Sequence, residues 1–155
     1  MHGTAITIID KSNMSIDIKT NNNHDDTKYI LLVDDEKDIL DLFTEYLTSN
    51  ELKIIYFQNP LEALNFLNCN INNCSLVITD YSMPQMSGLD FIKHIRNIDR
   101  NFIIKIILIT SYIKNNLVID KSSNLRIDKI IEKPIPLEKL KDEVKLLMLP
   151  ILVSN

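Results

Sequence analysis

Apolar residues along this chain form two alternating patterns, one of short unbroken runs and one of residues that recur every three or four positions. Unbroken runs are typical of parallel strands that are covered on both faces, and the recurring pattern is typical of helices with one buried face. The runs occupy residues 29–33, 53–57, 76–79, 103–109 and 127–132. Because the two patterns alternate, the sequence predicts an α/β fold with a parallel sheet and right-handed crossovers.

The helices predicted between and after these strands each have one apolar face. The second helix has a defined start and runs to about Leu67, because Asn59 can cap it and Pro60 suits its first turn. Residues 115–121 can form a short helix that the following polar residues end. The apolar faces of the other helices comprise Ile39, Leu40, Phe43, Tyr46 and Leu47, then Phe91, Ile92, Ile95 and Ile98, and finally Leu137, Leu140, Val144 and Leu147.

Five strands of this kind favour the doubly wound, flavodoxin-like arrangement, in which the strand order is 2-1-3-4-5. The first and third strands are neighbours in that order, and both end in carboxylates. Asp34 and Asp35 follow the first strand, Asp80 follows the third, and Lys133 follows the fifth. Since the carboxyl ends of parallel strands share one edge of the sheet, we expect these groups to form one pocket.

The 155 residues are expected to contain one domain, residues 29–149, with an N-terminal leader at 1–28 and a short tail at 150–155. The leader contains two short alternations of apolar and polar residues, at 5–9 and 15–19. We interpret it as flexible. The alternative is a hairpin that packs on the domain or on a second copy of the chain.

Charge and apolar content exclude several classes of protein. The net charge of −4 argues against a nucleic-acid-binding surface, which is usually basic. No apolar run approaches the roughly 18 residues of a membrane span, and the N-terminus lacks the features of a signal peptide. We therefore expect a cytoplasmic chain without membrane insertion. Cys69 and Cys74 are interpreted as free thiols, because no further Cys or close His completes a metal set.

The predicted pocket has the groups needed to receive a phosphoryl group. Asp34, Asp35 and Asp80 would repel one another and raise one another's pKa, and a divalent cation would relieve this. Oxygen ligands suit Mg²⁺. Asp80 can then attack a phosphoryl group and become an aspartyl phosphate, while Lys133 supplies positive charge and the Thr110 hydroxyl donates a hydrogen bond. Helix capping explains the acidic pair alone, but not the joint spacing of all these groups.

The order and spacing of these residues resemble the receiver domain of two-component response regulators. The resemblance covers roughly residues 29–148. The motifs that carry it are Asp34-Asp35, Asp80 with Met83, Pro84 and Gly88, then Thr110, and finally Lys133-Pro134.

The resemblance implies a role for each group of the pocket. Asp80 would be the phosphoacceptor and, together with Asp35, a direct ligand of Mg²⁺. Asp34 would act on the metal through water, and the backbone carbonyl of Ser82 would be another ligand. Thr110 would be the switch hydroxyl. The lysine of the fifth strand would bind the phosphate, and the peptide bond that follows it would be cis.

One position departs from the family pattern. Receivers usually carry an aromatic residue three positions before the lysine, and here that position is Ile130. The coupling between phosphorylation and the surface around the fifth strand is therefore expected to be altered, with Tyr112 as a candidate substitute.

We expect a stand-alone receiver, because the last helix leads directly into the tail. It would be a signalling domain and not an enzyme, taking its phosphoryl group from a histidine kinase or phosphotransfer protein. Its output would be a changed affinity for a downstream protein target through the fourth helix, fifth strand and last helix, without direct contact to nucleic acid. A homodimer is a further assembly to test.

Two alternatives remain open. The first is a receiver-like binding module that works without phosphorylation. The second is an enzyme with an aspartyl nucleophile, such as a haloacid-dehalogenase-like phosphatase. Such an enzyme usually carries a second Asp two residues after the first, and Ser82 at that position argues against this second alternative.

Overall fold

The computed structural model describes residues 28–48, 53–111 and 123–152. In these ranges the chain forms a five-stranded parallel sheet with the order β2-β1-β3-β4-β5, which confirms the predicted topology. The strands are β1 (Tyr29–Val33), β2 (Lys53–Phe57), β3 (Cys74–Asp80), β4 (Lys105–Thr110) and β5 (Lys129–Glu132). The helices are α1 (Lys37–Leu47), α2 (Pro60–Asn70), α3 (Gly88–Ile98) and α5 (Leu137–Leu152), with short 3₁₀ helices η1 (Ile71–Asn73) and η2 (Ser123–Leu125).

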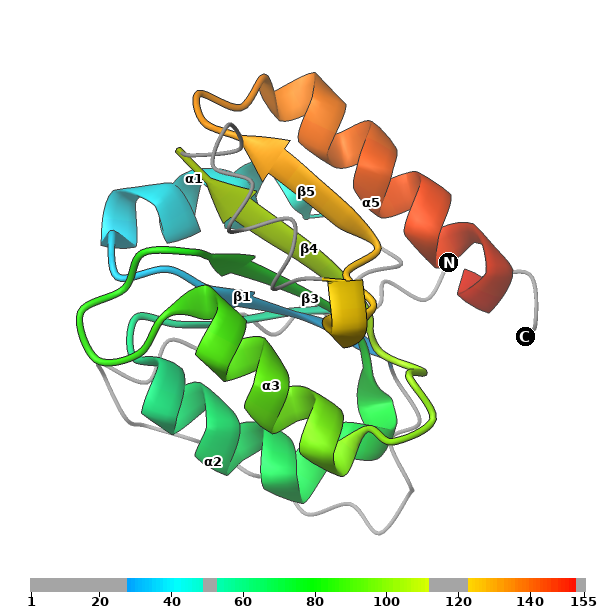
Figure 1. The fold of residues 1–155 in the computed structure, drawn as a ribbon. Coiled ribbons are helices and arrows are strands. Elements are labelled where there is room, and N and C mark those ends of the chain that lie inside the picture. The colour runs from blue at the N-terminus through cyan, green and yellow to red at the C-terminus, as the bar shows by residue number, and fades with distance from the viewer. Residues whose placement is uncertain (1–27, 49–52, 112–122, 153–155) are drawn as a thin grey trace, which may run out of the picture.

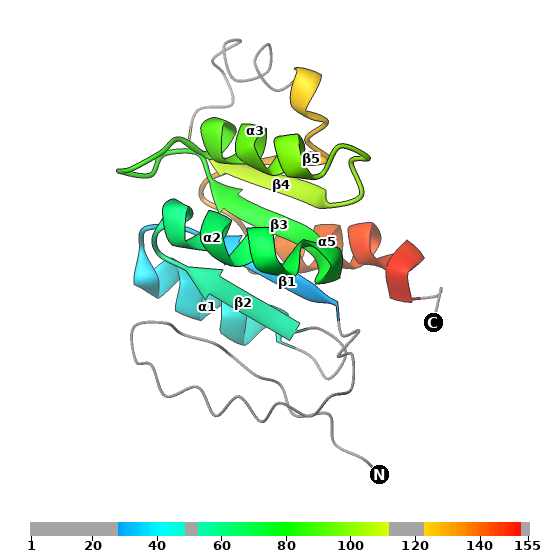
Figure 2. The ribbon, with the colours of Figure 1, turned by 90° about the horizontal axis from the view of Figure 1, so that it is seen from below.

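Helices cover both faces of the sheet, α2 and α3 on one and α1 and α5 on the other (Figure 1, Figure 2). Alternate residues of β1 therefore enter different cores. Leu31 and Val33 pack in the cluster that contains residues of α2 and α3, and Ile30 and Leu32 pack in the cluster that contains residues of α1 and α5. Burial on both faces explains why the strands are unbroken apolar runs in the sequence.

Helix starts follow the local sequence. The Asn59 side chain accepts a hydrogen bond from the Leu61 amide at 2.9 Å, and Pro60 occupies the first turn of α2, as predicted. At α3 the Ser87 hydroxyl accepts from the Asp90 amide at 3.1 Å. This second cap fixes the point at which the loop after β3 becomes helix.

Several boundaries differ from the sequence prediction. The sequence predicts a helix that ends near Leu67 and a strand that begins at residue 76, with the polar run 68–75 between them as a loop; in the structure α2 continues to Asn70, and β3 begins at Cys74, which is buried together with Ser75. Ile98 was assigned to the buried face of α3 and is instead 41% exposed. The helix α5 continues through Pro150 to Leu152, beyond the expected start of the tail.

Some expectations lie outside the described residues: the leader up to residue 27, Tyr112, the short helix at 115–121 and the last three residues of the tail. None of the helices within the described ranges combines the length and hydropathy that a membrane span requires.

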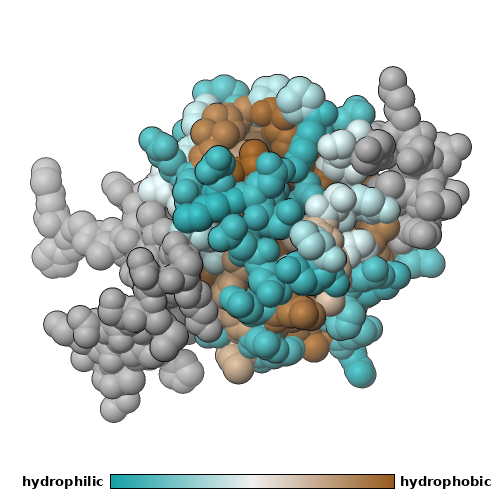
Figure 3. Space-filling view, turned by 90° about the vertical axis from the view of Figure 1, so that its left-hand side faces the viewer, coloured by the Kyte–Doolittle hydropathy of each residue, from teal (hydrophilic) through white to brown (hydrophobic). Residues whose placement is uncertain are grey.

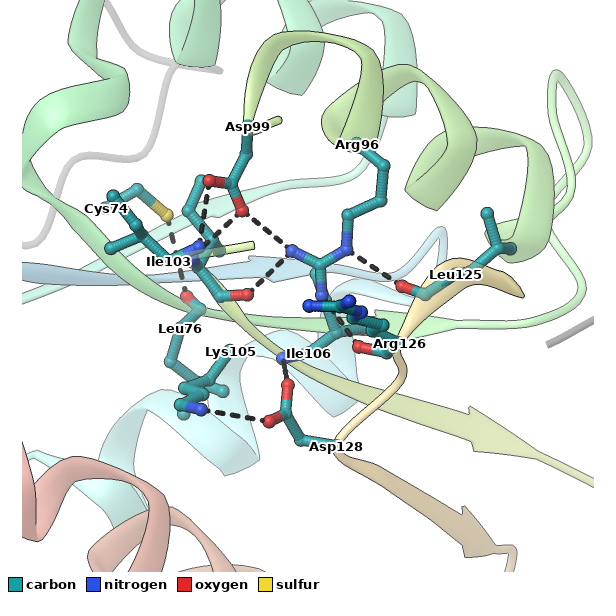
Figure 4. Close-up of polar contacts among 11 residues, drawn as sticks. Cys74, Leu76, Arg96, Asp99, Ile103, Lys105, Ile106, Leu125, Arg126 and Asp128 are labelled. Atoms are coloured by element: carbon teal, nitrogen blue, oxygen red, sulfur yellow. Dashed lines mark hydrogen bonds and ion pairs between the residues drawn. The ribbon is translucent and has the colours of Figure 1, made fainter. Parts of the chain in front are cut away.

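A buried ion pair holds the C-terminal end of α3 against the segments before β4 and β5 (Figure 4). Arg96 contacts Asp99 at 2.8 Å, and both side chains are buried. The same guanidinium donates to the carbonyl oxygens of Ile104, Leu125 and Arg126. Because the donors and acceptors satisfy one another, the cost of burying the two charges is offset. Arg96 stands four residues after Ile92 and so lies on the buried face of α3, but arginine is usually exposed, and the sequence analysis therefore did not place it inside.

Candidate functional site

Asp80 is the last residue of β3, and its position depends on a close approach by Gly88. The amide of Tyr81 donates to the carbonyl of Ile109 at 2.7 Å, and the Gly88 amide donates back to the carbonyl of Tyr81 at 2.8 Å. A Cβ atom added at Gly88 would lie 2.2 Å from the carbonyl oxygen of Asp80. Only glycine therefore allows α3 to begin this near the end of β3.

Lys133 extends from the end of β5 into the carboxylates at the ends of β1 and β3. Its backbone amide donates to the carbonyl of Thr110 at 2.9 Å, and its peptide bond to Pro134 is cis. The Lys133 ammonium lies 2.8 Å from Oδ1 of Asp80, 3.6 Å from Oδ2 of Asp34 and 3.8 Å from Oε1 of Glu36. Lys133 thus links the carboxyl ends of β1, β3 and β5, which the predicted strand order places at one edge of the sheet.

Asp34 is buried and only partly satisfied. Its Oδ1 accepts a hydrogen bond from the Glu36 amide at 2.9 Å, whereas its buried Oδ2 has no hydrogen-bond donor among the described residues and faces the Lys133 ammonium at 3.6 Å. The pKa of Asp34 is raised to about 6, chiefly by burial. The charges of Asp80 and Asp35 also raise the pKa, and the Glu36 amide and the Lys133 charge partly offset the rise. A buried carboxylate oxygen that lacks a donor beside other carboxylates is suited to a hard cation.

Lys133 stays positively charged in this environment. Burial alone would lower its pKa, but the hydrogen bond to Asp80 and the charges of Asp34, Asp80 and Glu36 outweigh burial and raise the pKa above its ordinary value. The lysine is therefore available as a fixed positive charge beside Asp80. Glu36, which the sequence analysis did not assign to the pocket, belongs to the same ion-pair group.

The other residues predicted for the pocket, Ser82, Thr110 and Asp35, differ in their contacts and in their burial. The Ser82 amide donates to Oδ2 of Asp80 at 2.7 Å, so the two oxygens of that carboxylate have separate donors. Thr110 is buried at the end of β4, and Asp35 is half-buried beside Asp34. Figure 3 views the molecule from the side to which the strands point. Hydrophilic residues occupy the centre of that face.

No group of three Asp, Glu, His or Cys side chains is arranged as a ready-made metal cluster among the described residues. The oxygen donors gathered around Lys133 are the carboxylates of Asp34, Glu36 and Asp80. Mg²⁺ commonly takes one or two carboxylates and completes its shell with water and phosphate oxygens. The donor set at these strand ends therefore fits Mg²⁺ better than a metal that needs several side chains.

Comparisons with known proteins were made for sequence and structure. Residues 30–145 match the family model of the response regulator receiver domain. Sporulation initiation phosphotransferase F of Bacillus subtilis is 29% identical over 116 residues, which are 75% of this chain and 90% of that protein. The cyclic di-GMP phosphodiesterase response regulator RpfG of Xanthomonas campestris is 35% identical over 83 residues, 52% of this chain and 21% of that protein.

The fold has solved counterparts. The CheX-CheY-BeF3-Mg+2 complex from Borrelia burgdorferi contains a chain with a TM-score of 0.69 and 25% identity, matched over 78% of this chain and 89% of that one. A receiver domain protein from Clostridium thermocellum gives a TM-score of 0.71 at 23% identity, over 83% and 99% of the two chains. The first curated relatives are longer proteins, of which this chain spans 11% and 21%.

Proposed function

Because the chain belongs to the response regulator receiver domain family, whose members act in two-component signalling, we propose that it accepts a phosphoryl group on Asp80. The observation that carries this proposal is the contact of 2.8 Å between the Lys133 ammonium and Asp80, at the point where β1, β3 and β5 end. A fixed cation next to a carboxylate nucleophile is what phosphoryl transfer requires.

The proposal includes Mg²⁺. Asp35 and Asp80 would hold it directly, Asp34 would hold it through water, and the backbone carbonyl of Ser82 would add a ligand. When bound, the cation would offset the negative charge that gathers on the transferring phosphoryl group. The buried Oδ2 of Asp34, which lacks a hydrogen-bond donor, supports this assignment.

The phosphodonor would be a phosphohistidine of a histidine kinase or phosphotransfer protein. An oxygen of the Asp80 carboxylate forms the new O–P bond while the P–N bond of the phosphohistidine breaks, and the imidazole leaves. Before transfer the carboxylate is held by the Ser82 amide and Lys133. After transfer the Lys133 ammonium pairs with a phosphoryl oxygen, and the Thr110 hydroxyl donates to another. Both contacts stabilise the added charge.

The output would be a change in protein contacts. Added charge at the ends of β3 and β4 biases the surface around β5 and α5, as phosphorylation does in other switches. We propose that residues 29–149 act as a receiver in the cytoplasm, that its target is another protein and not nucleic acid, and that dimerisation with a second copy is one form of output. The domain assists its own phosphorylation and does not turn over a separate substrate.

Intact-mass analysis after incubation with acetyl phosphate and Mg²⁺ tests this proposal. We expect one phosphoryl adduct in the wild type and none in Asp80→Asn or in a metal-free sample. Asp90→Asn, an exposed position in α3, is the matched control and should be phosphorylated normally. Lack of an adduct on the wild type, with acetyl phosphate and with a histidine kinase, would favour the binding module that works without phosphorylation and would direct attention to Ile130.

A further inference from the structure

A cleft of about 470 Å³ lies at the end of the sheet opposite the carboxylate pocket. Its walls come from the residues at which β3 and β4 begin, Cys74 and Lys105, and from the last part of α3 and of α5. The C-terminal part of α5 lies at this end of the molecule (Figure 1). The volume is in the range of clefts that hold a ligand or a peptide segment.

The cleft and its surroundings are apolar and exposed. Ile103 is 68% exposed and Ile98 is 41% exposed, and both line the cleft. Leu147 of α5 also lines it, and its helix neighbours Leu146 and Leu149 are exposed large hydrophobic residues. Four of the six exposed large hydrophobic residues in the described ranges are thus at this end. Such a concentration marks a surface that another segment covers.

The rim of the cleft carries positive charge. Lys28, Arg100 and Lys105 line it, and among the residues that the structure describes only Lys105 of the three has a carboxylate partner, Asp128 at 3.2 Å. Asp99 also lies in the lining, but its charge is used by the buried Arg96 (Figure 4). An occupant with apolar residues and a net negative charge would therefore match both the floor and the rim.

We propose that residues 5–18 of the chain's own N-terminal segment bind in this cleft. Lys28 lines the cleft, so the 27 residues that precede it start from the cleft rim. Residues 5–18 contain Asp10, Asp17 and Lys11, a net charge of −1, and the residues that link them to Lys28 add Lys19, Asp25 and Asp26, so that both parts are net negative and complement the rim. Their apolar anchors are Ile6, Ile8, Ile9, Ile16 and Ile18.

The tether favours this occupant over a separate protein. Ile18 lies ten residues before Lys28, and ten extended residues span up to about 35 Å, so the segment can fold back without strain. A short flexible tether gives an effective concentration of roughly millimolar, which a free partner must exceed to compete. The inference does not depend on the proposed function, because the cleft and Asp80 lie at opposite ends of the sheet.

Hydrogen–deuterium exchange of the full chain, followed by mass spectrometry, tests the proposal. We expect amides within residues 5–18 to exchange at least tenfold more slowly than unprotected amides. Ile103→Asp places a charge in the cleft at an exposed site, so the domain should stay folded while residues 5–18 lose their protection. Leu61→Asp is the matched control: Leu61 is 48% exposed on α2, away from the cleft, and its replacement should leave the protection unchanged.

Each other outcome would overturn the proposal. Unprotected amides at residues 5–18 in the wild type would show that the segment does not bind. Protection that survives in Ile103→Asp would show a structure formed without the cleft, and equal loss in Leu61→Asp would show a nonspecific effect. Protection that disappears when the protein is diluted a hundredfold would assign the cleft to the segment of a second copy. Exchange of β1 and β3 in the same experiment verifies that each variant is folded.

Discussion

At the residue scale, the pocket is defined by a lysine with three carboxylate neighbours and by a carboxylate that the fold leaves incompletely satisfied. Lys133 pairs with Asp80, while Asp34 keeps one oxygen without a donor. A bound divalent cation would therefore reduce the repulsion among these carboxylates. Without the cation, the unfavourable charge on Asp34 should make the free energy of unfolding depend on pH.

Asp34 should make the fold less stable at neutral pH than in mild acid. The pKa of Asp34 is about 6, against 3.8 ordinarily, because of burial. Between about pH 4 and pH 6 the Asp34 carboxyl keeps its proton in the folded chain and has lost it in the unfolded chain. The contribution of Asp34 to stability therefore falls over this pH range and stays low at higher pH. Asp34→Asn should raise the free energy of unfolding at pH 7 by about 1–3 kcal/mol and remove that part of the slope.

Urea denaturation at pH 4.5 and pH 7, without divalent cations, measures this difference. Asp142→Asn on the exposed face of α5 is the control and should leave the pH slope as in the wild type. An Asp34→Asn variant with the wild-type slope would show that the carboxylate is solvated and that the proposed charge imbalance is absent.

Gly88→Ala should be destabilising and should disturb the pocket. The added methyl group would lie 2.2 Å from the Asp80 carbonyl oxygen and 2.9 Å from the Tyr81 Cα, both backbone atoms that cannot rotate away. Overpacking of this kind costs about 1–3 kcal/mol. Thermal unfolding measures the loss, with Lys93→Ala on the exposed face of α3 as a near-neutral reference. A Gly88→Ala variant as stable as that reference would mean that α3 can shift freely.

At the element scale, the sequence predicted the strand order and the shared edge of the sheet because parallel strands buried on both faces leave unbroken apolar runs. It misplaced element boundaries where polar residues are buried: Ser75 lies inside β3 although it reads as part of a polar loop. It also missed the buried Arg96–Asp99 pair, because both residue types are usually exposed and because the carbonyl partners of Arg96 at Leu125 and Arg126 are distant in sequence.

Arg96→Met should be among the most damaging changes outside the pocket. It would leave the buried Asp99 carboxylate without its charged partner, and three backbone carbonyls in the segments before β4 and β5 without their donor. Loss of one member of a buried pair costs about 3–5 kcal/mol. Chemical denaturation of Arg96→Met beside the exposed Arg100→Met tests this. Equal midpoints for the two variants would contradict a structural role for the buried pair.

At the scale of the whole molecule, the two ends of the sheet differ in character. The carboxyl ends carry the acidic pocket with Lys133, and the amino ends carry an apolar cleft with a basic rim. The first arrangement was predictable, because its residues directly follow the strands. The second was not, since Ile103 reads as part of a buried strand and becomes exposed only when β4 begins at Lys105.

The central claim is that Asp80, and none of its acidic neighbours, receives the phosphoryl group. Borohydride reduction of the protein after treatment with acetyl phosphate and Mg²⁺ converts an aspartyl phosphate into homoserine, and peptide sequencing by mass spectrometry locates that residue. The account predicts homoserine at position 80 alone, and a much lower yield in Lys133→Met than in the exposed control Lys139→Met. Homoserine at Asp34 or Asp35, or at no position in a protein that a histidine kinase also fails to phosphorylate, would contradict it.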